Sequence, residues 1–113
     1  MNFVIKGTVI KGDGYGRKIG FPTVNLEVEH ELQKEEFLPR GVYAGTGTLD
    51  GIEYRAGIVI DPKDKVEAHL IGYDGDAYGK TVILDLKKFI REYRNFDTEE
   101  ELINQIKEDL QTC

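Results

Sequence analysis

Glycines and turn-forming pairs divide most of this chain into short segments. The 113 residues include 13 glycines, spread from Gly7 to Gly79, whereas glycine averages about 7% of residues in soluble domains. Asp50-Gly51 separates two apolar segments, which is a strong signal for a two-residue β-hairpin turn. Short segments rich in β-branched residues and bounded by such turns are typical of antiparallel β proteins.

Six segments between these turns have the composition of strands. We expect strands at Phe3–Ile10, Pro22–Val28, Val42–Leu49, Ile52–Ile60, Val66–Tyr73 and Thr81–Phe89. In the last of these, Val82, Leu84 and Leu86 share one face, because alternate side chains of a strand point to the same side. The charged segment His30–Glu36 is expected to be a solvated loop or a single helical turn.

The spacing of apolar residues changes near the C-terminus from that of a strand to that of a helix. Thr98–Glu101 reads Thr-Glu-Glu-Glu, a capping box with an acidic first turn. Leu102, Ile103, Ile106 and Leu110 follow at helical spacing. They predict an amphipathic helix of about three to four turns, packed on an open side or end of the β structure. The fold class is therefore expected to be mainly β, a small antiparallel barrel with one C-terminal helix, in a single domain spanning residues 1–113.

Charge and composition exclude several classes of protein. The net charge is −6, which argues against a nucleic-acid surface, because binding to a phosphate backbone needs a basic patch. No apolar run approaches the length of a membrane span, and no signal peptide is visible. The single cysteine, Cys113, permits no internal disulfide, which fits a reducing cytoplasm. We therefore expect a cytoplasmic protein without nucleic-acid or membrane partners. We also expect a monomer.

Glycines and cations are concentrated in one loop after the first strand. The residues are Gly12, Gly14, Gly16, Arg17 and Lys18. Alternating glycines let backbone N–H groups approach a ligand closely and form an anion-binding concavity, and the two cations can reach phosphate oxygens. The alternative is a glycine-rich hairpin turn with a solvated basic tip. The loop is not a P-loop, because it lacks the Gly-Lys-Ser/Thr ending.

Two neutral oxygen ligands follow this loop. Thr23 and Asn25 are two residues apart, so in an extended chain they face the same side. A hydroxyl and an amide oxygen beside a phosphate cradle suit a hard cation such as Mg²⁺, which needs few protein ligands.

One strand has alternating polar residues that could take part in catalysis. In Val66–Leu70, Glu67 and His69 share the face opposite to three apolar residues. Glu67 is either a general base for an attacking alcohol or a residue on the solvent face of an edge strand. His69 is expected to be a satisfied structural histidine.

Residues 12–25 read Gly-x-Gly-x-Gly-Arg-x-x-Gly-Phe-Pro-Thr-x-Asn, and this segment resembles the signature of the riboflavin kinase family. The resemblance continues, in order, through Gly41–Gly45, Val66–Leu70, Asp74–Lys80 and Ile90–Asp97. It implies a six-stranded Greek-key barrel that phosphorylates riboflavin to FMN with ATP and Mg²⁺, or with Zn²⁺ or Mn²⁺ in its place. Riboflavin and ATP would then be the only partners.

The resemblance also implies roles for individual residues. Glu67 matches the catalytic carboxylate, and Thr23 and Asn25 match the residues that meet the metal and the nucleotide phosphates. The remaining matches are, on the nucleotide side, Gly12, Gly14, Gly16, Arg17, Leu70 and Tyr78 and, on the flavin side, Arg91, Arg94 and Phe96. Alternative roles are a core aromatic for Tyr78 and an anchor at the helix entrance for Phe96.

One segment departs from the family pattern. Between the fourth and fifth expected strands the family has Asn-Ile-Gly and then Pro-Thr-Phe, where this chain has only the short segment Asp61–Lys65. The segment could be a tighter hairpin, or it could weaken ligand binding. The main alternative to a kinase is therefore a weak or inactive flavin- or nucleotide-binding domain. A barrel that binds oligonucleotides is disfavoured by the acidic charge.

Overall fold

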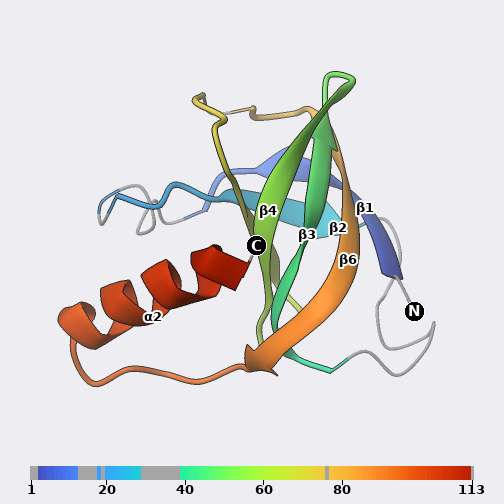
Figure 1. Cartoon of the computed structure of the whole chain (residues 1–113). Coiled ribbons are helices and arrows are strands. Elements are labelled where there is room, and N and C mark those ends of the chain that lie inside the picture. The colour runs from blue at the N-terminus through green and yellow to red at the C-terminus, as the bar shows by residue number, and fades with distance from the viewer. Residues whose placement is uncertain (1–2, 13–17, 19, 29–38, 76, 113) are drawn as a thin grey trace.

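The computed structural model describes residues 3–12, 18, 20–28, 39–75 and 77–112, and Figure 1 shows the arrangement. Six strands form a closed antiparallel barrel, and one helix follows. The elements are β1 (Phe3–Ile10), β2 (Val24–Val28), β3 (Gly41–Leu49), β4 (Ile52–Ile60), β5 (Val66–Leu70), β6 (Thr81–Glu92) and α2 (Glu99–Thr112). The expected fold class, a mainly β six-stranded barrel with a C-terminal helix, is confirmed.

The strand order around the barrel is β1-β2-β5-β4-β3-β6. Strands β3, β4 and β5 form a meander, and β2 and β6 flank it on either side. β6 returns beside β3, the first strand of the meander, and β2 lies beside β5, the last, so each set of four strands has a Greek-key order. Closure leaves no edge strand among the six, so every strand has two hydrogen-bonded neighbours.

The barrel interior is the hydrophobic core. Strand alternation places Val82, Leu84 and Leu86 inside, with at most 1% of each residue exposed. Ile58 and Ala68, from neighbouring strands, are fully buried as well. These residues face inward because successive side chains of a strand point alternately to the two sides of the sheet. The intervening side chains face outward, where a ligand can reach them.

Some strand boundaries differ from the expected ones. β2 begins at Val24, and β5 ends at Leu70 instead of Tyr73. The chain turns there because the Tyr73 N–H donates to the Leu70 carbonyl at 3.1 Å, and Gly72 has a φ of 90°, a conformation that glycine adopts without strain. The segment His30–Glu36 lies outside the described residues.

The shortened segment Asp61–Lys65 is a tight, well-bonded hairpin. Oδ1 of Asp61 accepts hydrogen bonds from the N–H groups of Lys63 and Lys65, at 2.8 and 2.9 Å. The Asp61 N–H donates to the Lys65 carbonyl at 3.0 Å, and Asp64 pairs with Arg40. The missing family motifs are thus replaced by an ordered turn whose backbone groups are paired.

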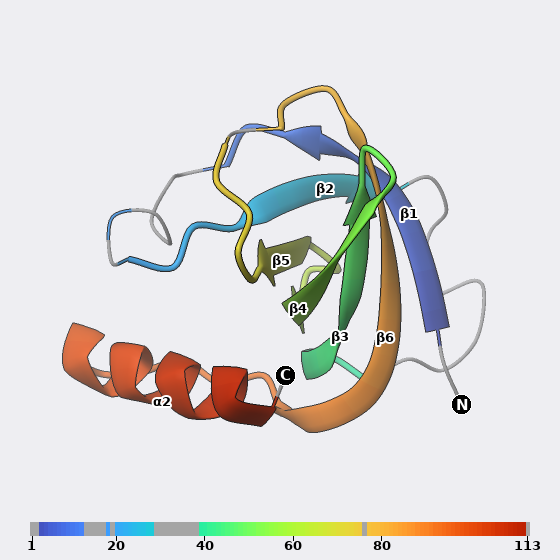
Figure 2. The same cartoon turned by 45° about the horizontal axis from the view of Figure 1, so that its top comes forward.

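The capping box predicted for the helix is present in part. Oγ1 of Thr98 accepts a hydrogen bond from the Glu101 N–H at 3.2 Å, and the Thr98 carbonyl accepts one from Leu102 at 3.2 Å. Figure 2 shows α2 outside the barrel, on the side of β3 and β4. Among the described residues, no helix is long and apolar enough to cross a membrane.

Candidate active site

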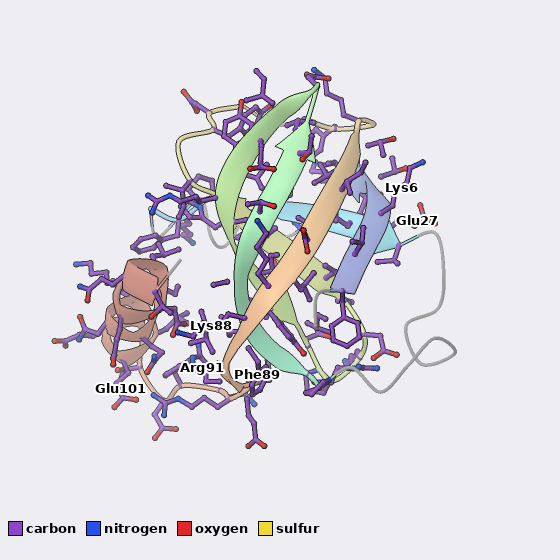
Figure 3. All side chains as sticks on the ribbon, turned by 45° about the vertical axis from the view of Figure 1, so that its right-hand side comes forward. Lys6, Glu27, Lys88, Phe89, Arg91 and Glu101 are labelled. Atoms are coloured by element: carbon purple, nitrogen blue, oxygen red, sulfur yellow. The ribbon has the colours of Figure 1, made fainter. Side chains whose placement is uncertain are left out.

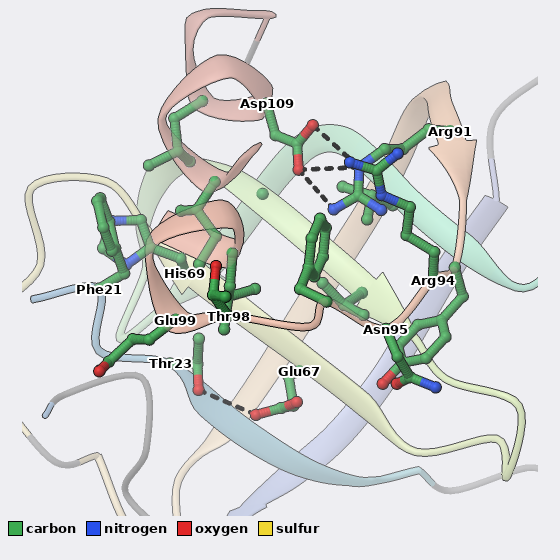
Figure 4. Close-up of a pocket in the computed structure, with 18 of the residues that line it drawn as sticks. Phe21, Thr23, Glu67, His69, Arg91, Arg94, Asn95, Thr98, Glu99 and Asp109 are labelled. Carbon is green, nitrogen blue, oxygen red and sulfur yellow. Dashed lines mark hydrogen bonds and ion pairs between the residues drawn. The ribbon is translucent and has the colours of Figure 1, made fainter. Parts of the chain in front are cut away.

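A cavity of about 590 Å³ separates α2 from the outer face of the barrel (Figure 4). Its barrel wall is formed by outward-facing residues of β3, β4 and β5, and its outer wall by the segment after β6 and by the apolar side of α2. The apolar helix residues on the cavity are Leu102, Ile106 and Leu110. The expectation that the helix stripe packs on the barrel was therefore incomplete, because much of the stripe faces this hollow.

Strand register aligns several predicted site residues in one row. Arg91 pairs with Val42, Val42 with Val59, Val59 with Glu67, and Glu67 with Asn25. Directly paired residues of neighbouring strands lie side by side on the same face. A residue predicted to bind flavin, the predicted base and a predicted metal ligand therefore lie on one outward-facing line across five strands.

Glu67 lies on the cavity and is half-buried. The Thr23 hydroxyl donates a hydrogen bond to Oε1 of Glu67 at 3.1 Å (Figure 4). This hydrogen bond fixes the Glu67 side chain. The alternative interpretation of Glu67, a solvent-exposed residue on an edge strand, is wrong. β5 is not an edge strand, and its outer face lines a cavity whose opposite wall includes α2.

Asn25 lies against the start of the glycine loop. A Cβ added to Gly12 would overlap the amide group of Asn25, so the backbone approaches that side chain more closely than any other residue would allow. The close approach joins the beginning of the loop to the strand that holds Thr23 and Asn25. Gly14, Gly16 and Arg17 lie outside the described residues.

The oxygen atoms in this corner suit a hard divalent cation. A threonine hydroxyl that donates its one hydrogen to Glu67 still has lone pairs for a ligand, and Asn25 adds an amide oxygen. Within the described part of the chain, no three or more His, Cys, Asp or Glu side chains gather as a metal site. Two neutral oxygens fit a cation such as Mg²⁺, which keeps most of its coordination for water and substrate phosphates.

His69 also lies on the cavity and has a defined partner. Its Nδ1 is 2.7 Å from the Pro22 carbonyl oxygen, and since a carbonyl only accepts, Nδ1 must hold the hydrogen. The His69 ring meets the edge of Phe21 at a centroid distance of 6.0 Å. His69 thereby fixes the backbone directly before Thr23, which agrees with the structural role expected for it.

The three residues predicted for the flavin side come together at the other end of the cavity. Arg91, Arg94 and Phe96 all line it. The guanidinium carbons of Arg91 and Arg94 lie 5.6 and 4.6 Å from the centre of the Phe96 ring. These distances are in the range of cation–π contacts, so the three side chains form one wall of aromatic and guanidinium planes.

Four of the described residues predicted to bind the nucleotide do not line this cavity, namely Gly12, Asn25, Leu70 and Tyr78. Leu70 is 3% exposed and belongs to the barrel core, so its side chain faces away from the cavity. Tyr78 is 53% exposed, and its alternative interpretation as a core aromatic is wrong. The hairpin Asp61–Lys65, which is described in full, contributes no residue to the cavity wall.

Asp109 is not among the site residues predicted from the sequence, although it is the one buried residue among those described in α2. Its carboxylate pairs with Arg91, with Nη2 and Oδ2 2.9 Å apart. Asp109 lies three residues after Ile106 and next to Leu110, on the apolar side of the helix. A carboxylate inside an apolar stripe was the signal in the sequence, because such a group is rarely buried without a partner.

Comparisons with known proteins identify the family to which the chain belongs. A family model described as riboflavin kinase matches residues 1–113. The RNA-binding riboflavin kinase of Bacillus subtilis is 34% identical over 95% of this chain and 48% of its own length. Among solved structures, the macrolide-efflux protein of Streptococcus pneumoniae superposes with a TM-score of 0.81 at 28% identity, over 96% of this chain and 37% of that one.

The riboflavin kinase of Trypanosoma brucei superposes with a TM-score of 0.77 at 23% identity, over 98% of this chain and 74% of that one, which supports the fold. The chain spans 16%, 48% and 37% of the length of the first three curated relatives that it matches. Since the family model covers residues 1–113, the chain belongs to the riboflavin kinase family.

Proposed function

We propose that this chain transfers the γ-phosphate of ATP to the 5′-hydroxyl of riboflavin, with FMN and ADP as products. The observation that supports this most directly is the position of Glu67. It lies in the row of paired residues between Arg91 and Asn25 and faces the cavity. A flat ring held at the Arg91 end would direct its ribityl chain toward Glu67, and the phosphates would lie beyond it near Gly12.

In this proposal Glu67 orients the 5′-hydroxyl and takes its proton as the oxygen attacks phosphorus. The bond between the γ-phosphorus and the oxygen that it shares with ADP breaks as the new bond forms. Phosphoryl transfer needs positioning and charge stabilisation more than covalent chemistry. Thr23 supports Glu67 through its hydrogen bond, and the Thr23 and Asn25 oxygens would hold the metal.

The family uses ATP together with a divalent metal. When bound, this metal would neutralise charge on the phosphates. We propose Mg²⁺ for the metal, with Mn²⁺ or Zn²⁺ as the alternatives, because the available protein ligands are neutral oxygens and Mg²⁺ accepts such incomplete protein shells. Gly14, Gly16 and Arg17 are proposed to bind the nucleotide phosphates on the strength of the family signature. Leu70 and Tyr78 remain proposed nucleotide residues on the same basis.

The second candidate is a domain that binds flavin without phosphorylating it. Its support was the short segment Asp61–Lys65, but this hairpin is well bonded and does not line the cavity. The position of the hairpin therefore favours the kinase. We also propose that residues 1–113 form one domain, because the family model matches all of them. We further propose that the chain is a monomer in the cytoplasm, a location that its single cysteine fits.

The test is to incubate the purified chain with riboflavin, ATP and Mg²⁺ and to separate the flavins by chromatography. We expect FMN and ADP in equal amounts, and no FMN when ATP is omitted. Quenching of flavin fluorescence without FMN formation would instead identify a binding domain. Replacing Mg²⁺ by Mn²⁺ or Zn²⁺ in the same assay decides the metal.

A further inference from the structure

The attachment of α2 to the barrel includes a buried polar contact. Of the apolar residues on its inner side, Leu102, Ile106 and Leu110 face the cavity and remain partly exposed. Asp109 is 6% exposed and is the one buried residue among those described in α2. A helix whose apolar stripe borders a hollow gains little from burial, so the contacts of Asp109 largely determine where it lies.

Asp109 holds Arg91 by both carboxylate oxygens. Nε of Arg91 is 3.2 Å from Oδ1 and 3.2 Å from Oδ2, and Nη2 is 2.9 Å from Oδ2 (Figure 4). Such forked, charge-assisted contacts fix the plane of the guanidinium group as well as its position. The last turn of α2, within the described residues, has no basic side chain of its own, so Arg91 also supplies the positive charge that favours a helix C-terminus.

The same carboxylate reaches Arg94 through a second residue. Nε2 of Gln105 donates to Oδ1 of Asp109 at 2.9 Å, and Nη2 of Arg94 donates to Oε1 of Gln105 at 3.0 Å. Both guanidinium groups that lie over the Phe96 ring are therefore linked to one buried carboxylate. Arg94 is otherwise an exposed side chain, and an exposed arginine without such a link samples many rotamers.

We propose that Asp109 is a positioning residue that sets the affinity for the flat ring of the substrate. It does so by holding Arg91 and, through Gln105, Arg94 in the wall that includes Phe96. A pre-ordered wall binds a rigid planar ring with less loss of side-chain freedom than a mobile one. In this proposal Asp109 takes no part in phosphate transfer, because both of its carboxylate oxygens are bound by Arg91.

This inference rests on the proposed function for the identity of the ring, and binding can be measured without turnover. In Asp109→Asn the amide keeps an oxygen for Arg91 but loses the charge. We expect the Kd for riboflavin, measured by quenching of flavin fluorescence, to rise about 3- to 30-fold, the range for residues that act on a ligand through a neighbour. The Kd for MgADP should stay within about twofold of the parent value, since the nucleotide end of the row is separate.

Glu108→Gln is the matched control, because Glu108 precedes Asp109 on α2, is exposed and loses the same charge. It should leave both affinities unchanged. Gln105→Met removes the hydrogen bonds of Gln105 to Asp109 and from Arg94 but keeps the Asp109–Arg91 pair. It should therefore give a smaller rise in the riboflavin Kd than Asp109→Asn. Helix content, followed by circular dichroism, shows whether α2 stays folded in each variant.

Three results would overturn the proposal. They are an unchanged riboflavin Kd in a folded Asp109→Asn, an equal loss of MgADP affinity, or the same effect from Glu108→Gln. If Asp109→Asn fails to fold, an unchanged riboflavin Kd in Gln105→Met would overturn it. A parent chain that binds riboflavin but makes no FMN would refute the proposed function and leave this inference intact. A parent chain that binds no riboflavin would refute both.

Discussion

Replacement of Glu67 by glutamine is the sharpest test of the catalytic site. The change keeps the length of the side chain and an oxygen that can accept the hydrogen bond from Thr23, now 3.1 Å from Oε1. Glu67 faces outward from β5 and is half-buried, while the core residues Val66 and Ala68 point inward. The substitution therefore removes a basic carboxylate without opening a hole in the core.

The structure separates the expected effects on rate and on stability. A positioned general base typically contributes about 10²–10⁴-fold to a rate, which corresponds to about 2.7 to 5.4 kcal/mol of activation free energy. The loss of folding stability should be about 1 kcal/mol, because the hydrogen bond from Thr23 to a partly exposed carboxylate is weakened while the Thr23 hydroxyl keeps an acceptor. A fall in turnover that greatly exceeds the fall in stability is thus the signature of a catalytic role.

The assay measures kcat for FMN formation, the Kd values of riboflavin and MgADP, and urea unfolding of the same preparation. Glu27→Gln is the matched control, because Glu27 is an exposed, outward-facing glutamate on β2, on the opposite side of the barrel from α2 (Figure 3). It should behave as the parent. Near-normal turnover in Glu67→Gln would remove Glu67 from the mechanism. Parallel losses of binding and stability would make it a structural residue.

Three further substitutions test other parts of the structure. Gly12→Ala should weaken MgADP binding about tenfold, because a Cβ would displace the Asn25 amide. An unchanged MgADP affinity, measured by calorimetry, would exclude this corner from the nucleotide site. Thr23→Ala should weaken MgADP binding to a similar degree without unfolding the chain, and an unaltered titration would exclude its hydroxyl from the metal site. Burial raises the pKa of Tyr43, and a nearby guanidinium acts in the opposite sense. The raised pKa keeps the phenol protonated in the folded state while it ionises in the unfolded state, so the stability present below about pH 10 is lost as pH rises through the folded pKa. Tyr43→Phe should therefore lower the free energy of unfolding by about 1 kcal/mol at pH 7, because the Pro39 carbonyl loses its donor. Between about pH 9 and 11 the free energy of unfolding of this variant, measured with urea, should fall less than that of the parent. Equal falls in the two proteins would contradict this.

The local sequence pattern predicted the elements and the two faces of each strand. Alternation in Val66–Leu70 indicated that Glu67 and His69 face away from the core, and the structure agrees. The capping threonine and the apolar spacing predicted α2. These predictions succeed because the direction of each side chain depends only on the repeat of the strand or helix. That repeat can be recognised from residues close together in the sequence. The glycine pattern predicted a close approach of the backbone to a ligand, which stays a prediction, whereas Gly12 lies against Asn25.

Only the tertiary structure decided what the outward face of β5 meets. The alternation of apolar and polar residues in a strand cannot show whether its polar face meets solvent or another element. Here that element is α2, which comes from a segment far along the chain. The register that places Glu67 between Val59 and Asn25 likewise joins residues distant in sequence, and Leu70, expected on the nucleotide, proved to be a core residue. The charge of Asp109 was visible in the apolar stripe of the helix, but its partner Arg91 lies on β6. A buried carboxylate is stable only with such a partner, and folding alone brings the two together.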